Sequence, residues 1–219
     1  FHFDPLCPWC WQTSRWMRRL VELGVVTAEW GVFSLEIANS PDGVAAVDPE
    51  ARGARGLRTA VLVRDTVDNA AMGAFYEALG NRHFHQLEKY DTPDTFHGAL
   101  RDAGLDPELY DRAMADIGTW NTVVAEHEEL VGETKAFGVP TIRLDGGKGP
   151  AIFGPVVSEL PTDEDAVALF EHVVWLTRYE NFAELKRERR DLDVPSAAAW
   201  RARQAAKAAA EAAANEPGR

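Results

Sequence analysis

The chain has 219 residues, of which 46% are hydrophobic, and this is enough for one large domain or for one domain with a sizeable insertion. The formal net charge of −12 argues against nucleic acid or an anionic membrane surface as the main partner, since both are bound by basic patches. No apolar run approaches the ~20 residues that span a bilayer, and two cysteines are too few for a structural disulfide framework.

Both cysteines lie in the motif Cys7-Pro8-Trp9-Cys10, which follows a short strand predicted over residues 1–4. Two cysteines three residues apart can close a small disulfide, so the motif indicates redox chemistry. Pro8 suits the first position of a helix, which leaves Cys7 at the N-cap. There its sulfur would accept backbone N–H groups, and the helix dipole would stabilise a thiolate. We therefore predict that Cys7 is the nucleophile.

Cys10 is predicted to face inward, because it lies at helical spacing from Met17, Leu20 and Val21. A buried thiol is poorly placed to meet a substrate but well placed to attack a mixed disulfide on Cys7. Cys10 is therefore the predicted resolving cysteine.

A zinc site is the alternative use of the two thiols, and His2, His83 and His85 are the only candidates for the further ligands. His83 and His85 lack the gap of three to five residues that is usual for zinc histidines, and there is no second cysteine pair. Redox chemistry is favoured, and no metal ligand is assigned.

The helix from Pro8 is predicted to end near Gly24, and a second strand follows over residues 28–35. Between residues 48 and 137 only helical periodicity is found, over residues 57–67, 70–79, 95–103, 107–117 and 121–137. A β-hairpin is predicted next, with strands over residues 139–144 and 151–153 around a turn at residues 145–147. An amphipathic helix then runs from residue 162 to beyond residue 175.

This order of elements is that of an α/β, thioredoxin-like fold with a large all-helical insertion. We assign residues 1–47 and 138–192 to the thioredoxin-like domain and residues 48–137 to the insertion. The Ala-rich segment 193–219 is predicted to be a peripheral helix or a disordered tail, because it forms helix readily but has few core-forming side chains.

The dithiol, the helical insertion and Gly138-Val139-Pro140-Thr141 together resemble the DsbA-like branch of the thioredoxin superfamily. More specifically, the chain resembles the actinobacterial mycothiol-dependent nitroreductase group. The matching segments are residues 3–16, 34–39, 80–82, 138–142 and 153–156. The resemblance implies a cytoplasmic reductase with no bound cofactor and no flavin. It also implies that mycothiol recycles the disulfide as the reducing co-substrate, and that certain nitroaromatic compounds can be reduced.

The partners expected from this resemblance are a low-molecular-weight thiol and a small electrophilic or disulfide substrate, with no nucleic acid and no membrane. The sequence leaves a homodimer open. The resemblance further implies that the Val139-Pro140 bond is cis and lies beside the dithiol, where it could bind an incoming thiol together with Pro8. Trp9, inside the dithiol loop, is expected to flank the nucleophilic sulfur, where its indole can cover a mixed disulfide or stack on an aromatic substrate.

Four further residues are candidates for thiol or substrate binding. Asn39 is one through the resemblance, although it could simply cap the turn after the second strand. Arg82, His83 and His85 fall where a helix of the insertion meets a loop, and they could equally form a solvated helix end. If they face the dithiol, Arg82 or a protonated histidine would lower the pKa of Cys7 and help to bind an anionic or sugar-bearing thiol.

Three rival functions remain open. A DsbA-like protein disulfide oxidase or isomerase of an exported compartment would use the same residues, and a reduction potential near ~−120 mV would favour it. A kappa-type thiol transferase or isomerase uses a thiol cofactor without a resolving cysteine, so Cys10 argues against it. The third is a redox-sensing or binding protein whose partner docks on the insertion.

Overall fold

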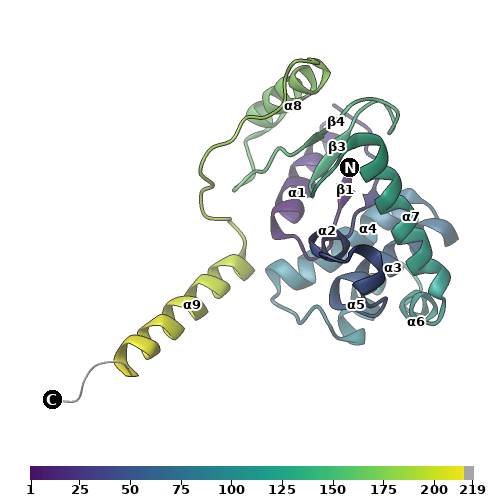
Figure 1. The fold of residues 1–219 in the computed structure, drawn as a ribbon, viewed down its shortest axis with the longest axis vertical. Helices are drawn as coiled ribbons and strands as arrows, with labels where there is room; N and C mark the ends of the chain where they lie inside the picture. The colour runs from purple at the N-terminus through teal and green to yellow at the C-terminus, as the bar shows by residue number, and fades with distance from the viewer. Residues whose placement is uncertain (215–219) are drawn as a thin grey trace.

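The computed structural model describes residues 1–214 and the side chains of residues 1–209. Its sheet has the strand order β2-β1-β3-β4. The strands are β1 (His2–Phe3), β2 (Gly31–Val32), β3 (Thr141–Arg143) and β4 (Ala151–Phe153). β1 lies parallel to β2 and antiparallel to β3, and β3 and β4 form the predicted hairpin. The first strand therefore lies at the centre of the sheet, and the dithiol follows it directly (Figure 1).

Two helices complete the thioredoxin-like part of the chain. They are α1 (Pro8–Glu22) and α8 (Asp163–Arg178), which contact one another. The buried indole of Trp16 in α1 donates a hydrogen bond of 3.1 Å to the carbonyl of Ala166 in α8. Thr162 caps α8 by accepting from the backbone N–H of Asp165, and three acidic residues in the first turn complement the helix dipole.

The segment between β2 and β3 is helical, and residues 48–137 within it contain helices and no strand, as predicted. It comprises α2 (Leu35–Asn39), η1 (Gly43–Ala46), α3 (Arg52–Thr66), α4 (Asn69–Gly80), η2 (Asn81–His85), α5 (Pro93–Asp102), α6 (Glu108–Ala115) and α7 (Ile117–Thr134). α3 lies at the centre and packs on α4, α6 and α7. The buried guanidinium of Arg58 in α3 donates to the carbonyls of Ala113, Met114 and Asp116, which joins α3 to the end of α6. Because a buried cation needs such partners, Arg58 specifies this packing.

The prediction of a second strand over residues 28–35 is wrong at both ends. The strand is only Gly31–Val32, and a short helix, α2, begins at Leu35. The hydroxyl of Ser34 accepts from the backbone N–H of Ile37, and the Asp4 carboxylate accepts from that of Leu35. Both bonds satisfy N–H groups that are free at a helix start, so the chain turns into a helix here.

The segment after α8 is ordered by two anchors. We call residues 180–194 the strap, since they run as extended chain from α8 to α9 (Pro195–Ala214) (Figure 1). Leu192 and Val194 are buried in the core, and the backbone N–H of Asp193 donates 2.8 Å to the carbonyl of Ser158. α9 contacts η2. The predicted tail is thus helical up to residue 214, and residues 215–219 lie outside the described residues.

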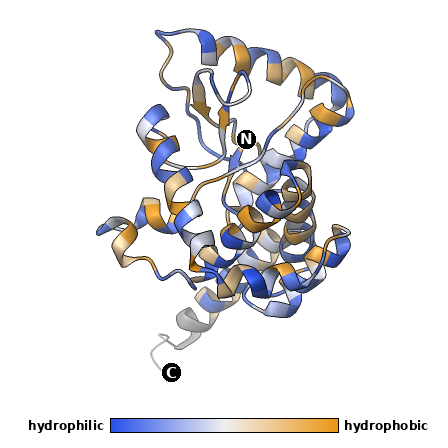
Figure 2. Cartoon of the chain, turned by 90° about the vertical axis from the view of Figure 1, so that its right-hand side faces the viewer, coloured by the Kyte–Doolittle hydropathy of each residue, from blue (hydrophilic) through white to orange (hydrophobic). Residues whose placement is uncertain are grey.

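Hydrophobic and hydrophilic residues are interspersed along the coloured helices (Figure 2). The buried side chains of both parts of the chain form one core cluster, which includes the two cysteines. Within residues 1–214, no helix is long and apolar enough to cross a membrane.

Candidate active site

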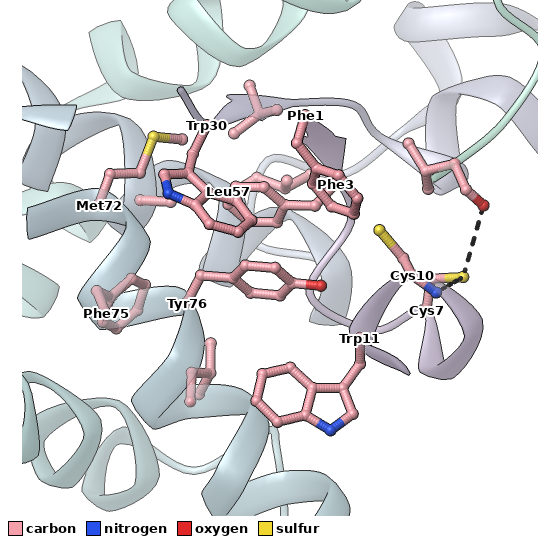
Figure 3. Close-up of a cluster of buried hydrophobic side chains, with 14 of the residues drawn as sticks. Phe1, Phe3, Cys7, Cys10, Trp11, Trp30, Leu57, Met72, Phe75 and Tyr76 are labelled. Carbon is pink, nitrogen blue, oxygen red and sulfur yellow. Dashed lines mark hydrogen bonds between the residues drawn. The ribbon is translucent and has the colours of Figure 1, made fainter. Parts of the chain in front are cut away.

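Cys7 occupies the N-cap of α1, as predicted. Its backbone is extended, Pro8 takes the first helical position, and the backbone N–H of Cys10 donates to the Cys7 sulfur at 3.4 Å. The Cys7 thiol in turn donates to the carbonyl of Val139 at 3.8 Å (Figure 3). The sulfur is thus held between a helix start and the loop that leads into β3.

Cys10 faces inward and is fully buried, as predicted. Its thiol donates to the carbonyl of His2 at 3.8 Å, and Met17 and Leu20 continue the same buried face. Val21 was expected on this face but is 42% exposed. Residues 21–25 are all exposed, so the packed part of α1 ends at Leu20. Both cysteines are free thiols in this structure.

The pKa of Cys7 is raised to about 11, opposite to the direction expected from the helix dipole. Burial of the sulfur is the largest cause. Hydrogen bonds from the backbone N–H groups of Cys10 and Trp9, and the positive charge of Arg189, act to lower the pKa, as a helix start should. They do not outweigh desolvation in this arrangement. Burial likewise raises the pKa of Cys10 well above its ordinary range.

Asp4 is a buried carboxylate beside the dithiol, and no role was predicted for it from the sequence. It is 1% exposed, and its two oxygens accept 2.8 Å hydrogen bonds from the backbone N–H groups of Leu6 and Leu35. Burial raises the pKa of Asp4 to about 6, and its charge raises the pKa of Cys7. The available signal was an aspartate directly after an apolar strand and three residues before the first cysteine.

The loop that carries Val139 and Pro140 lies against Cys7, and the Val139-Pro140 bond is cis, as predicted. A second cis bond, Gly154-Pro155, was not predicted. The hydroxyl of Thr13 in α1 donates to the Pro155 carbonyl at 2.9 Å. Two proline segments therefore contact the N-terminal half of α1.

Trp9 is half-buried and lies under the strap. The Arg189 guanidinium lies 5.1 Å from the centre of the Trp9 ring, a distance at which a cation is attracted to an aromatic face. Ser158 connects the strap to α1, because its carbonyl accepts from the side chain of Gln12 and from the backbone N–H of Asp193. The strap therefore borders the dithiol loop, a contact that no sequence pattern predicts.

Arg82 is engaged with acidic residues of the insertion. Its guanidinium donates to Asp102 at 2.7 Å and to Glu88 at 2.9 Å, and the ring of His83 bonds the Glu88 carbonyl at 3.0 Å. Burial is the main cause that lowers the pKa of His83. The largest contributions to the pKa of Cys7 come from other groups, so a direct action of Arg82 on the dithiol stays a prediction.

His85 and Asn39 lie on different elements. The His85 ring, in η2, meets the Trp11 ring edge-on with centroids 6.0 Å apart, which brings His85 to the helix that carries the dithiol. Burial lowers the pKa of His85 and favours its neutral form. Asn39 is the last residue of α2 and is exposed. Among the described residues, no group of three or more His, Cys, Asp or Glu side chains could hold a metal ion.

Comparison with known structures agrees with the predicted fold class. The fold is similar to that of DsbM, a cytosolic disulfide reductase from Pseudomonas aeruginosa, with a TM-score of 0.55 and 16% identity over 80% of this chain and 97% of DsbM. A structure of DsbM with GSH gives the same values. At this identity the likeness concerns the fold, which is the DsbA-like form of the thioredoxin fold.

Comparison of sequences identifies the family. The chain is 33% identical to the Mycobacterium tuberculosis protein Rv2286c over 199 residues, which are 89% of this chain and 83% of Rv2286c. Residues 6–187 match the family described as Rv2466c-like, mycothiol-dependent nitroreductase Rv2466c. This match includes the dithiol, the insertion and the hairpin. The chain therefore belongs to the Rv2466c-like family of mycothiol-dependent nitroreductases.

Proposed function

We propose that the protein is a thiol-disulfide oxidoreductase in which Cys7 attacks, Cys10 resolves and mycothiol restores the dithiol. The observation that carries this proposal is the unequal placement of the two sulfurs. Cys7 lies at a helix start beside the Val139 carbonyl, whereas Cys10 is fully buried behind it. Of the two residues only Cys7 keeps any solvent exposure, 9%, so a substrate sulfur would meet Cys7 first, and Cys10 is within one helical turn of the bond it must break.

The reaction proceeds in two exchanges. The Cys7 thiolate attacks one sulfur of a disulfide substrate, and the other sulfur leaves as a thiol after taking a proton. Cys10 then attacks Cys7, so the second substrate thiol leaves and the Cys7–Cys10 disulfide forms. Two mycothiol molecules return two electrons and two protons to this disulfide and become mycothiol disulfide. Reduction of an aromatic nitro group to a nitroso group and water consumes the same two electrons and two protons.

The environment of Cys7 favours a reductase over the rival oxidase. In the strong oxidant DsbA, the nucleophilic thiolate is stabilised and its pKa is ~3.5. Here burial raises the pKa of Cys7 to about 11, so the thiolate of the reduced protein is not stabilised. We expect a reduction potential nearer to the ~−270 mV of thioredoxin than to the ~−120 mV of DsbA. We place this activity in the cytoplasm, where low-molecular-weight thiols keep dithiols reduced.

The proposal is tested by turnover of a disulfide and of a nitroaromatic compound with mycothiol or glutathione as the reductant. Cys7→Ser should abolish turnover, and Cys10→Ser should trap a mixed disulfide of mycothiol on Cys7. The chain has only two cysteines, so each variant keeps one thiol and the intact mass identifies the adduct. Turnover with glutathione and none with mycothiol would refute the co-substrate, and full activity of Cys7→Ser would refute the dithiol mechanism.

A further inference from the structure

Tyr76 belongs to α4, within the helical insertion, yet its side chain reaches the dithiol. The ring is fully buried and stacks on Phe3 of β1, with centroids 3.9 Å apart and an interplanar angle of 10°. Trp11 and Trp30 meet the Tyr76 ring edge-on, with centroids 5.8 Å and 5.9 Å away. These contacts fix the ring, and Figure 3 shows its hydroxyl pointing toward the Cys10 sulfur.

The Tyr76 hydroxyl has no hydrogen-bond partner of standard geometry while Cys10 is a thiol. A buried hydroxyl without a partner is unfavourable, so a local group that can accept its hydrogen should be expected. The Ser14 hydroxyl nearby donates to the carbonyl of Trp11 at 2.7 Å and forms no hydrogen bond of standard geometry with Tyr76. Interaction with Tyr76 also acts to lower the pKa of Cys10, in agreement with the direction in which the hydroxyl points. A thiolate accepts a hydrogen bond far better than a thiol does.

We propose that the Tyr76 hydroxyl donates a hydrogen bond to the Cys10 sulfur when that sulfur becomes the attacking thiolate. This hydrogen bond accelerates resolution of the mixed disulfide on Cys7. This inference rests on the proposed function. In the step, a bond forms between Cys10 and Cys7 while the bond from Cys7 to the co-substrate sulfur breaks. The leaving sulfur takes the electron pair and, in net terms, the proton that Cys10 has lost.

Tyr76 keeps its own proton throughout this step. Burial is the main cause that holds the pKa of its hydroxyl well above the usual range, and the neighbouring Cys10 raises it further. Tyr76 therefore acts as a hydrogen-bond donor and not as an acid. The insertion thus contributes one group to the chemistry of the thioredoxin-like part.

Tyr76→Phe removes the hydroxyl and keeps the packed ring. Tyr90→Phe is the matched control, because Tyr90 is also fully buried with an unpartnered hydroxyl but packs on Phe96 and His83. The reduced variants are mixed with Ellman's reagent in a stopped-flow instrument. The first release of thionitrobenzoate reports attack by Cys7, and the second reports resolution by Cys10.

We expect Tyr76→Phe to slow the second release by about fivefold and to leave the first unchanged. Loss of a hydrogen bond to a charged group lowers the thiolate population of Cys10, and the higher nucleophilicity of the less stabilised thiolate offsets about half of this loss in the rate. Tyr90→Phe should leave both rates unchanged. The melting temperature of Tyr76→Phe should not fall, because the change removes an unpartnered hydroxyl. A second release as fast as in the wild type, or equal slowing in Tyr90→Phe, would overturn the inference.

The same experiment separates this inference from the proposed function. If the wild-type protein gives no second release, or if Cys10→Ser still gives it, resolution by Cys10 is refuted and the proposed function fails. If the wild type resolves normally and Tyr76→Phe matches it, only the role of Tyr76 fails.

Discussion

The buried charge of Asp4 should make the stability of the protein depend on pH in a way that one substitution removes. Asp4→Asn keeps the size of the side chain but abolishes its ionisation. The pKa of Asp4 is about 6, against an ordinary value of 3.8, which is a difference of about two units. At ~1.36 kcal/mol per unit, ionised Asp4 costs about 3 kcal/mol of folding free energy at pH 7.

The direction of this pH dependence follows from the pH range in which the folded and unfolded chains bind different numbers of protons. Between about pH 4 and pH 6 the folded chain holds the Asp4 proton and the unfolded chain does not. The contribution of Asp4 is therefore favourable at low pH and is lost as the pH rises through 6. From pH 7.5 down to pH 5, titration of Asp4 should recover ~1.4 kcal/mol of unfolding free energy.

Buried histidines act in the opposite direction, so the comparison must be made between variants. The pKa of His2 is lowered to about 4 by burial, and stability that depends on neutral His2 is lost as the pH falls from 6.5 to 4. The wild type and Asp4→Asn share this background. Subtracting their pH profiles leaves the contribution of Asp4 alone.

The assay is unfolding in urea between pH 5 and pH 7.5, with the free energy extrapolated to zero denaturant. The difference in stability between the wild type and Asp4→Asn should grow in favour of the wild type by ~1.4 kcal/mol on acidification. Asp68→Asn is the control for loss of a carboxylate that accepts a backbone N–H, since Asp68 is exposed and Asp4 is buried, and it should not reproduce the gain of the wild type on acidification. Parallel profiles for the wild type and Asp4→Asn would refute the reasoning.

Two further predictions concern neighbouring elements. Gly80→Ala should lower the free energy of unfolding, measured by thermal denaturation, by about 1–3 kcal/mol, because the new Cβ would overlap the Trp11 ring. Gly132→Ala has open space around it and should raise that free energy by about 0.5–1 kcal/mol. A Gly80→Ala variant as stable as the wild type would contradict the packing of α4 against Trp11. Arg82→Ala should cost about 1 kcal/mol or less of unfolding free energy, since its ion pairs lie within the insertion. The alkylation rate of Cys7 in this variant tests the predicted action of Arg82 on the dithiol: a slower rate would support that action, and an unchanged rate would refute it.

The start of the site could be predicted from sequence because its determinants are local. Cys7 and Pro8 set the N-cap and the first helical position within two residues, and helical spacing alone places Cys10 inward. The helices of the insertion could be predicted for the same reason, although their ends differ by several residues from those expected. Helix ends depend on single capping bonds, which a periodic pattern does not contain.

Elements fixed by contacts between distant residues could not be predicted. The short helix α2 depends on the Asp4 carboxylate, which accepts from Leu35, 31 positions along the chain. Tyr76 is one aromatic residue among several in a helical pattern, and nothing in that pattern connects it to Cys10. The ion-pair partners of Arg82, Asp102 and Glu88, are likewise apparent only after folding.

The middle of the strap lies beside Trp9 but is not what holds the strap to the core. Arg189 and its neighbours border Trp9, yet the strap is anchored mainly by Leu192, Val194 and the carbonyl of Ser158. Exposed connecting segments tolerate replacement far better than packed elements do. An engineered library that varies residues 184–190 while keeping the anchors could therefore sample new specificities at the dithiol at little cost in stability.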